Sequence, residues 1–154
     1  MDYILSEKKQ ECIFCAAFKE NKDRENYVLK RLGDCFIIMN TFPYNNGHLM
    51  IAPKKHTGDL HSIPDTILVQ MMKLLQLAQH VLTKAISPDG FNIGMNIGTV
   101  AGAGIADHIH MHIVPRWQGD TNYMPVLGDT RVMPQHLDHT YDLLRPHFKT
   151  TESA

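Results

Sequence analysis

The sequence predicts an α+β fold: one domain with an antiparallel sheet of about five strands, a long helix and a C-terminal helix. Three observations carry this prediction. Short apolar or alternating segments recur between turn residues, one long segment repeats apolar residues at helical spacing, and 154 residues suit one core but are short for two. We expect a single domain over residues 1–154, helices packed on one face of the sheet, and a loose tail at 150–154.

The expected strands are short segments bounded by turn residues, and they cover residues 27–31, 35–40, 48–52, 91–96 and 108–115. The first two flank Gly33 and Asp34, which are turn formers, so we expect a hairpin there. Pro53 should end the third strand, because proline has no amide to give to a ladder.

Two helices are expected. The longer one opens at Pro64 and Asp65, with Ser62 or Ser87 bounding it. Its apolar residues recur every three or four positions, as in a helix with one buried face: Ile67, Leu68, Met71, Met72, Leu74, Leu75, Ala78, Val81 and Leu82. The second covers residues 135–144, with Pro134 in its first turn and Pro146 near its end.

Three histidines stand at alternate positions near the end of the chain: His108, His110 and His112. A strand turns alternate side chains to the same face, about 6.6 Å apart at ~3.3 Å per residue. One phosphate or one metal ion could therefore contact two of them. A polar strand at a sheet edge would also explain one histidine, but it explains three in a row poorly.

Taken alone, the histidines could be a nucleophile or metal ligands. A neutral imidazole is a competent nucleophile near pH 7, because its unperturbed pKa is about 6.5. Metal-binding strands of the cupin type add a glutamate a few residues later, but the only glutamate after His112 is Glu152. Barrel amidohydrolases also use His-x-His but typically need ~250 residues. The nucleophile fits better than either metal alternative.

Cys12 and Cys15 form a Cys-x-x-Cys pair among three cysteines. Such a pair is half of a zinc site or a redox motif, and a redox motif would need a strand-to-helix context. Cys35 alternates with apolar residues, so we expect it in the core. Zinc is the favoured interpretation, although the pair leaves two ligands to be found.

The composition argues against several functions. Lys and Arg number 15 against 16 for Asp and Glu, a formal net charge of −1. Without a basic run, we expect no nucleic-acid partner and no membrane anchor. The first nine residues lack the apolar core of a signal peptide, so a cytoplasmic location is expected.

Several motifs carry a family resemblance. Residues 106–117 resemble the signature of the histidine triad (HIT) family of nucleotidyl hydrolases and transferases. Residues 45–56 resemble the family's Gly-His strand and following Pro-Lys-x-His, and residues 12–15 its zinc-containing members. Residues 96–104 fill the glycine-rich approach to the triad. The resemblance covers most of the chain, with the motifs in the family's order.

The resemblance implies roles for individual residues. His110 would be the nucleophile, His112 would contact the same phosphate, and His48 would complete the pocket wall. A structural zinc ion would be held by Cys12, Cys15, His56 and His108. Substrate would contact Asn40 at the ribose and, around the phosphates, Asn96, Gly102, Ala103 and Gly104. From the residues alone, His48 and Asn40 could equally be strand-end residues, and the glycines a tight turn.

The same resemblance implies a homodimer paired across the long helix, whose Met71, Met72, Leu75 and Gln79 would cover a wide apolar arc. Residues 116–126 resemble a branch of the family that acts on dinucleoside polyphosphates. Trp117 would line the nucleotide site or a dimer contact.

Hydrolysis of a dinucleoside polyphosphate such as diadenosine tetraphosphate, through a nucleotidyl-histidine intermediate, is the first expectation. Phosphorolysis of the same substrates, nucleoside phosphoramidase activity and a slow nucleotide-binding interaction protein are the alternatives. The chain departs from the common pattern before the triad, where Gly104 and Ile105 replace a Gln and a Ser or Thr. This departure removes a side-chain donor to the leaving phosphate, which favours the binding protein. It also leaves room for phosphate as the acceptor.

Overall fold

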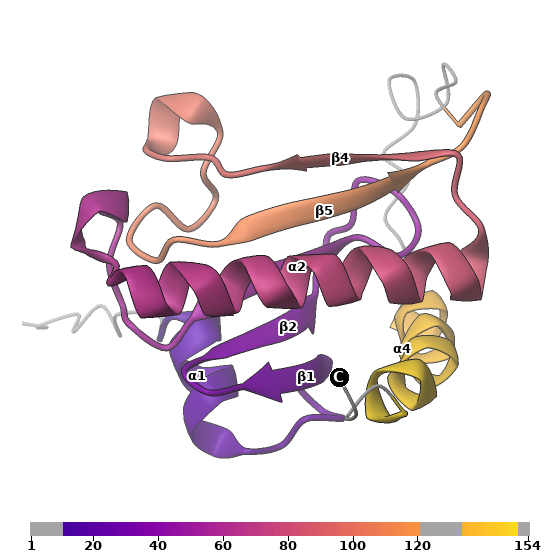
Figure 1. Cartoon of the computed structure of the whole chain (residues 1–154), viewed down its shortest axis with the longest axis horizontal. Helices are drawn as coiled ribbons and strands as arrows, with labels where there is room; N and C mark the ends of the chain where they lie inside the picture. Colours follow the sequence, from indigo (N-terminus) through magenta and orange to yellow (C-terminus); the bar gives the residue numbers. More distant parts are fainter. Residues whose placement is uncertain (1–10, 121–133, 151–154) are drawn as a thin grey trace, which may run out of the picture.

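The structure is a computed structural model, and it describes residues 11–120 and 134–150. Five antiparallel strands form one sheet in the order β1-β2-β3-β5-β4 (Figure 1). The strands are β1 (Val28–Leu32), β2 (Cys35–Met39), β3 (Leu49–Pro53), β4 (Gly90–Gly94) and β5 (Met111–Arg116). The expected α+β class, strand number and direction are therefore confirmed. Of the tail expected at 150–154, residues 151–154 lie outside the described residues.

The histidine strand is shorter than predicted. The β5 ladder begins at Met111, so His108 and His110 precede it, where the sequence predicted a strand from residue 108. The reason is a change of partner: the Ile109 amide donates to the Thr57 carbonyl at 2.8 Å, in the segment after β3, and not to β3 itself. The alternation nevertheless persists, since Ile109 packs into the core on the opposite side from the histidines.

The long helix α2 (Asp65–Ile86) has the predicted limits, with Pro64 before it and Ser87 in a left-handed conformation after it. It crosses one face of the sheet in Figure 1 and buries six side chains there: Met71, Leu74, Leu75, Ala78, Val81 and Leu82. No helix in the described part of the chain is both long and apolar enough to cross a lipid bilayer. Cys35 is fully buried in the same core, as predicted.

A helix that the sequence analysis missed covers the opposite face. α1 (Ile13–Glu20) has eight residues and places Phe14 and Ala17 against the sheet. The expectation that all helices pack on one face was therefore wrong. The chain gave a weak signal, because a helix of only eight residues is marginal without tertiary packing.

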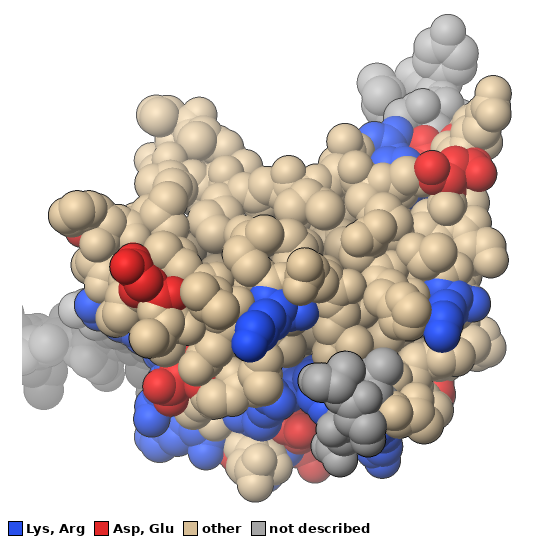
Figure 2. Space-filling view, in the orientation of Figure 1, with Lys and Arg blue, Asp and Glu red and all other residues tan. Residues whose placement is uncertain are grey.

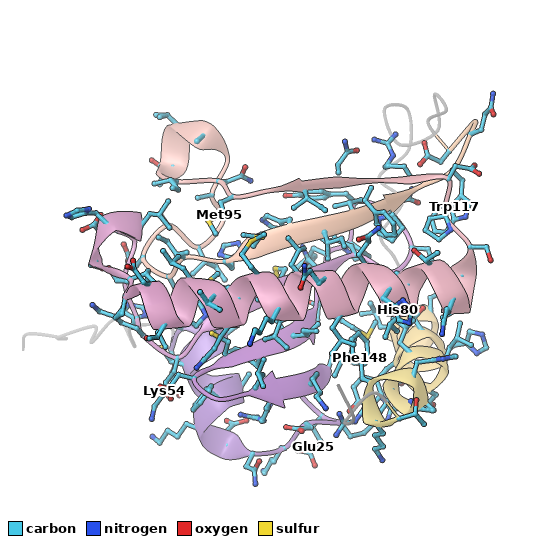
Figure 3. The ribbon with its side chains drawn as sticks, in the orientation of Figure 1. Glu25, Lys54, His80, Met95, Trp117 and Phe148 are labelled. Atoms are coloured by element: carbon cyan, nitrogen blue, oxygen red, sulfur yellow. The ribbon has the colours of Figure 1, made fainter. Side chains whose placement is uncertain are left out.

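The C-terminal helix α4 (Pro134–Lys149) continues five residues beyond the predicted end and includes Pro146. Proline removes one helical hydrogen bond, but burial of neighbouring side chains offsets that loss. Leu144 and Phe148 are fully buried against the sheet and α2, and Figure 3 shows Phe148 on α4.

The apolar arc predicted on α2 is partly wrong. Met71 and Leu75 are buried in the core, whereas Met72 and Gln79 are exposed. The large apolar side chains exposed nearby are Val69 and Met72 on α2 and Ile93 on the edge strand β4, each about half exposed at 52%, 50% and 49%. Figure 2 shows that most of this face is uncharged, with separate charged side chains along the line of α2 and others at the lower edge and near the end of β5.

Candidate active site

The three histidines lie on the sheet face that α1 covers. The Phe14 ring packs against His108 and His110, with centroid separations of 5.1 and 4.8 Å. The His110 and His112 rings are 4.8 Å apart and nearly perpendicular. The predicted sharing of one face is therefore observed, although two of the three residues lie outside the ladder.

The backbone fixes the tautomer of His110. Its Nδ1 lies 2.8 Å from the carbonyl oxygen of His108, and a carbonyl only accepts, so Nδ1 must carry the proton. Nε2 then has the lone pair and no hydrogen-bond partner among the described residues. Because every fully buried side-chain nitrogen or oxygen in the described chain has a partner, this Nε2 must reach the surface. His110 thus presents an unprotonated, accessible nitrogen.

A series of hydrogen bonds fixes the tautomers of His48 and His112. The Tyr44 backbone amide donates to His48 Nδ1 at 3.1 Å, so neutral His48 carries its proton on Nε2. That nitrogen lies 2.9 Å from His112 Nδ1 and donates to it. His112 therefore carries its own proton on Nε2, which can donate to a phosphate oxygen. The Tyr44 ring lies against both imidazoles, with centroids at 4.6 and 5.9 Å.

Burial keeps these imidazoles neutral. Burial, with repulsion from the adjacent imidazoles, lowers the pKa of His48 to about 3 and that of His112 to about 4. Burial also lowers the pKa of His110, although its bond to the His108 carbonyl acts in the opposite direction. All three side chains are therefore uncharged at neutral pH, which preserves the lone pair of His110.

Protein stability should depend on pH through His48 and His112. Above about pH 6.5 both residues are neutral whether folded or unfolded. Between about pH 6.5 and 4 the unfolded chain binds protons that the folded chain refuses, so the free energy of unfolding falls as the pH falls. We expect His112 to account for a loss on the order of 1 kcal/mol, allowing for its partial exposure. Urea titrations at pH 7 and pH 5 should show a smaller loss in His112→Asn than in the wild type, and equal losses would contradict the assignment.

Glycine permits two close approaches near the histidines. Gly47, just before His48, has φ +76°, and a Cβ there would lie 2.8 Å from Ile86 Cδ1 at the end of α2. Gly58 follows Thr57, and a Cβ there would lie 2.5 Å from the Ala106 carbonyl. The close packing of the segments that carry His48 and His56 therefore depends on glycine at both positions.

The predicted substrate residues lie in two loops. Asn40 follows β2, accepts from the Phe42 amide at 2.9 Å, and its Nδ2 lies 3.4 Å from His48 Nδ1. Asn96 donates to the Gly102 carbonyl at 3.4 Å. Both residues therefore have structural contacts, and Asn40 is also joined to His48.

The glycine-rich loop uses two of its amides internally. The Gly102 amide donates to the Thr99 carbonyl at 3.0 Å, and the Ala103 amide donates to the Gly98 carbonyl at 3.3 Å. The Gly104 amide donates to no group within the described ranges. Of the three amides expected to meet phosphate, Gly104 is thus the one without a described acceptor.

Four side chains converge into a cluster that could bind a metal ion: Cys12, Cys15, His56 and His108, with ligand atoms all within 4.8 Å of one another. The His108 Nδ1 atom lies 3.4 Å from Cys12 Sγ, 3.6 Å from Cys15 Sγ and 3.1 Å from His56 Nδ1. A tetrahedral zinc ion at ordinary bond lengths needs sulfur–nitrogen distances of about 3.6 Å and nitrogen–nitrogen distances of about 3.3 Å. The donor set therefore fits one tetrahedral ion.

The surroundings of His108 suit the same ion. Its Nε2 lies 2.7 Å from the Pro53 carbonyl and must donate to it, which leaves the Nδ1 lone pair facing the cluster. Burial and the adjacent Cys12 thiol raise the pKa of Cys15, so a bound cation would favour the thiolate of that residue.

Two residues at this site were missed from the sequence. Phe14 lies between the two cysteines and packs on two triad histidines. Tyr44 stands four residues before His48 and supplies the amide that fixes its tautomer. An aromatic residue close to a candidate catalytic histidine was the available signal for Tyr44. The contacts of Phe14 depend on a helix that was not predicted.

Trp117 has an intramolecular role. Its indole nitrogen donates to the Ser87 carbonyl at 3.2 Å, just after α2 ends, and Figure 3 shows it at that corner of the molecule. The part of the predicted branch motif from residue 121 to residue 126 lies outside the described residues.

A cavity of about 430 Å³ lies away from the histidines and is lined by Asp23, Lys30, Arg31, Arg145, Phe148 and Lys149. Its arginines are already engaged, because Arg31 and Arg145 share the Asp23 carboxylate and each donates to backbone carbonyls. Structural contacts therefore explain this concentration of positive charge.

Comparison with known proteins points to one family. The family model described as HIT domain matches residues 21–119. A Mycobacterium tuberculosis protein named AP-4-A phosphorylase is 39% identical over 122 residues, which are 79% of this chain and 63% of that protein. The chain thus spans less than two thirds of that relative's length.

Solved structures show the same fold. A zinc-bound histidine triad family protein from Mycobacterium smegmatis has a TM-score of 0.73 and 28% identity, over 91% of this chain and 94% of its own. A hypothetical histidine triad nucleotide-binding protein from Sulfolobus tokodaii has a TM-score of 0.74 at 24% identity, over 90% and 93% of the two chains.

Proposed function

Because this chain belongs to the HIT domain family, we propose that it is a nucleotidyl transferase that splits dinucleoside polyphosphates, with inorganic phosphate as the acceptor. The observation that carries the proposal is the state of His110: a neutral, accessible Nε2 whose tautomer is fixed by a backbone carbonyl. The similarity to the mycobacterial AP-4-A phosphorylase supports phosphorolysis over hydrolysis, which was the first expectation from the sequence.

The first step uses the lone pair of His110. With diadenosine tetraphosphate, Nε2 attacks the α-phosphorus, a P–N bond forms, and the P–O bond to the remaining ATP breaks. His112, with its proton on Nε2, donates to an oxygen of the same phosphate as negative charge develops. The Gly104 amide and Asn96 are the remaining donors that we assign to the departing phosphates.

In the second step an oxygen of inorganic phosphate attacks the adenylyl phosphorus. The P–N bond breaks, the electron pair returns to His110 Nε2, and ADP is released. Water in place of phosphate would give AMP. Asn40, which is joined to His48, is assigned to the ribose hydroxyls.

Labelled inorganic phosphate distinguishes the two acceptors. With diadenosine tetraphosphate as substrate, we expect the label to enter ADP, with unlabelled ATP as the other product. Label that stays in free phosphate while AMP and ATP accumulate would assign the chain to hydrolysis. If the protein consumed no dinucleoside polyphosphate and no nucleoside phosphoramidate, nucleotide binding without turnover would be the remaining function.

We assign the Cys12, Cys15, His56 and His108 cluster to one structural zinc ion, as its distances and the zinc-bound relative support. When bound, the ion would cross-link the start of α1 to the segments after β3 and before β5. None of the three cysteines forms a disulfide, as is usual in a reducing compartment, so we propose a cytoplasmic location.

A homodimer through the face formed by α2 and β4 is the proposed assembly, because Val69, Met72 and Ile93 are exposed there. Met72→Glu should halve the mass measured by light scattering, since a buried charge would oppose association. Gln79→Glu, also exposed on α2, is the control and should remain dimeric if the contact centres on Met72. A stable monomer of the unmodified chain would contradict the proposal.

A further inference from the structure

The loop that carries Tyr44 and His48 is fastened by Asn45. Its side-chain amide donates to Asp120 Oδ2 at 2.8 Å and to the Pro115 carbonyl at 3.1 Å. Its backbone carbonyl accepts from the His48 amide at 3.3 Å. One residue therefore joins the end of β5 to the turn that leads into His48.

Asp120 is itself held in one orientation. Arg116 donates to both carboxylate oxygens, from Nε at 2.7 Å and Nη2 at 2.8 Å, and the Trp117 amide donates at 3.0 Å. The side chain of Asp120 is only 10% exposed. A carboxylate offers acceptors alone, so it can receive all four donors without placing a proton against any of them.

The hydrogen bonds of Asn45 affect the histidines through its neighbour Tyr44. Tyr44 immediately precedes Asn45, and its amide fixes the tautomer of His48, which in turn fixes that of His112. If Asn45 lost its two acceptors, the Tyr44 amide and ring would no longer be held in place. His48 could then adopt its other tautomer, and His112 would lose the donor that keeps its Nε2 protonated.

We propose that Asp120 and Asn45 are positioning residues for the triad: they hold the Tyr44 amide on His48, so that His112 presents a protonated Nε2 to the substrate phosphate. This inference rests on the proposed nucleotidyl transfer for its kinetic consequence, but the tautomers that it specifies exist without substrate. Neither residue contacts the three histidines of the triad through a direct hydrogen bond within the described chain.

Asp120→Asn is the sharpest variant, because it keeps the shape of the side chain and turns one acceptor into a donor. The new NH2 group would place a donor against another donor, either Arg116 Nη2 or the set that includes Asn45 Nδ2. Asn45→Ala removes the same link from the other side. Asp89→Asn is the matched control: that carboxylate, at the same corner, accepts from the Gln118 amide at 2.8 Å and makes no hydrogen bond to the loop among the described residues.

Two measurements on the full chain decide the question. Nitrogen-15 NMR of the imidazoles, without substrate, should show His48 and His112 as Nε2-protonated tautomers in the wild type and Asp89→Asn, and mixed tautomers in Asp120→Asn and Asn45→Ala. With diadenosine tetraphosphate and phosphate, kcat should fall by about 10- to 100-fold in those two variants, with KM changing far less.

Unchanged tautomers in both variants would overturn the inference, even if the variants were less stable or less active, because a merely structural role would explain those losses. Wild-type kcat in a variant with mixed tautomers would overturn it as well. If the wild type turned over no substrate, the proposed function would fail, and the NMR comparison would still decide the positioning role.

Discussion

Replacing His110 with alanine is expected to lower kcat by at least about a thousandfold while leaving nucleotide affinity nearly unchanged. The side chain removed is the one whose Nε2 is unprotonated, accessible and aligned by the His108 carbonyl. The sheet, the glycine-rich loop and His112 remain in place, so the groups that we assign to substrate binding persist. Steady-state kinetics and calorimetric titration with a nucleotide product provide the two measurements.

His80→Ala is the matched control, because His80 is exposed on α2 and lies on the opposite side of the sheet from the triad. It should retain wild-type kcat. Substantial turnover in His110→Ala, with the protein folded, would move the nucleophile to another residue.

Loss of the metal cluster should have the largest effect on stability. Cys12→Ser or His56→Ala is expected to reduce the free energy of unfolding by on the order of 4 kcal/mol, because the cross-link between α1 and the triad segment is lost. For a chain of this length that corresponds to roughly a 10 °C lower Tm. Elemental analysis of the wild type should find one zinc ion per chain, and scanning calorimetry should find the lower Tm in the variants.

His61→Ala serves as the control, since His61 is exposed in the same segment as His56 and is not among the cluster ligands. It should keep both zinc and Tm. A wild-type protein that contains no metal, and whose Cys12 and Cys15 are alkylated at the rate of free thiols, would refute the cluster.

Much of the fold could be predicted because its signals are local. The limits of α2 follow from Pro64 at its start and Ser87 at its end, and Gly33 marks the β1–β2 turn. These features depend on the conformational preferences of single residues, which follow from the residue type alone.

The errors arose where distant segments decide the structure. The start of β5 depends on which strand Ile109 pairs with, and its partner is Thr57 in a loop. The arc expected to form the dimer contact included Met71 and Leu75, but the core against the sheet buries both. α1 is stabilised by the sheet surface beneath Phe14, which no property of its eight residues reveals.

The site shows the same division. Alternation along one strand was enough to place the three histidines on a common face. Their tautomers depend on Tyr44, the His108 carbonyl and the Pro53 carbonyl, contacts that only the folded chain defines.

The covalent intermediate is the most direct test of the central claim that His110 receives the nucleotidyl group. The protein would be mixed with diadenosine tetraphosphate in the absence of inorganic phosphate, quenched within a single turnover, digested and mapped by mass spectrometry. We predict one added AMP, located on His110 and discharged to ADP when phosphate is supplied. An adduct on another residue, or no adduct in protein that turns over the same substrate, would contradict the account.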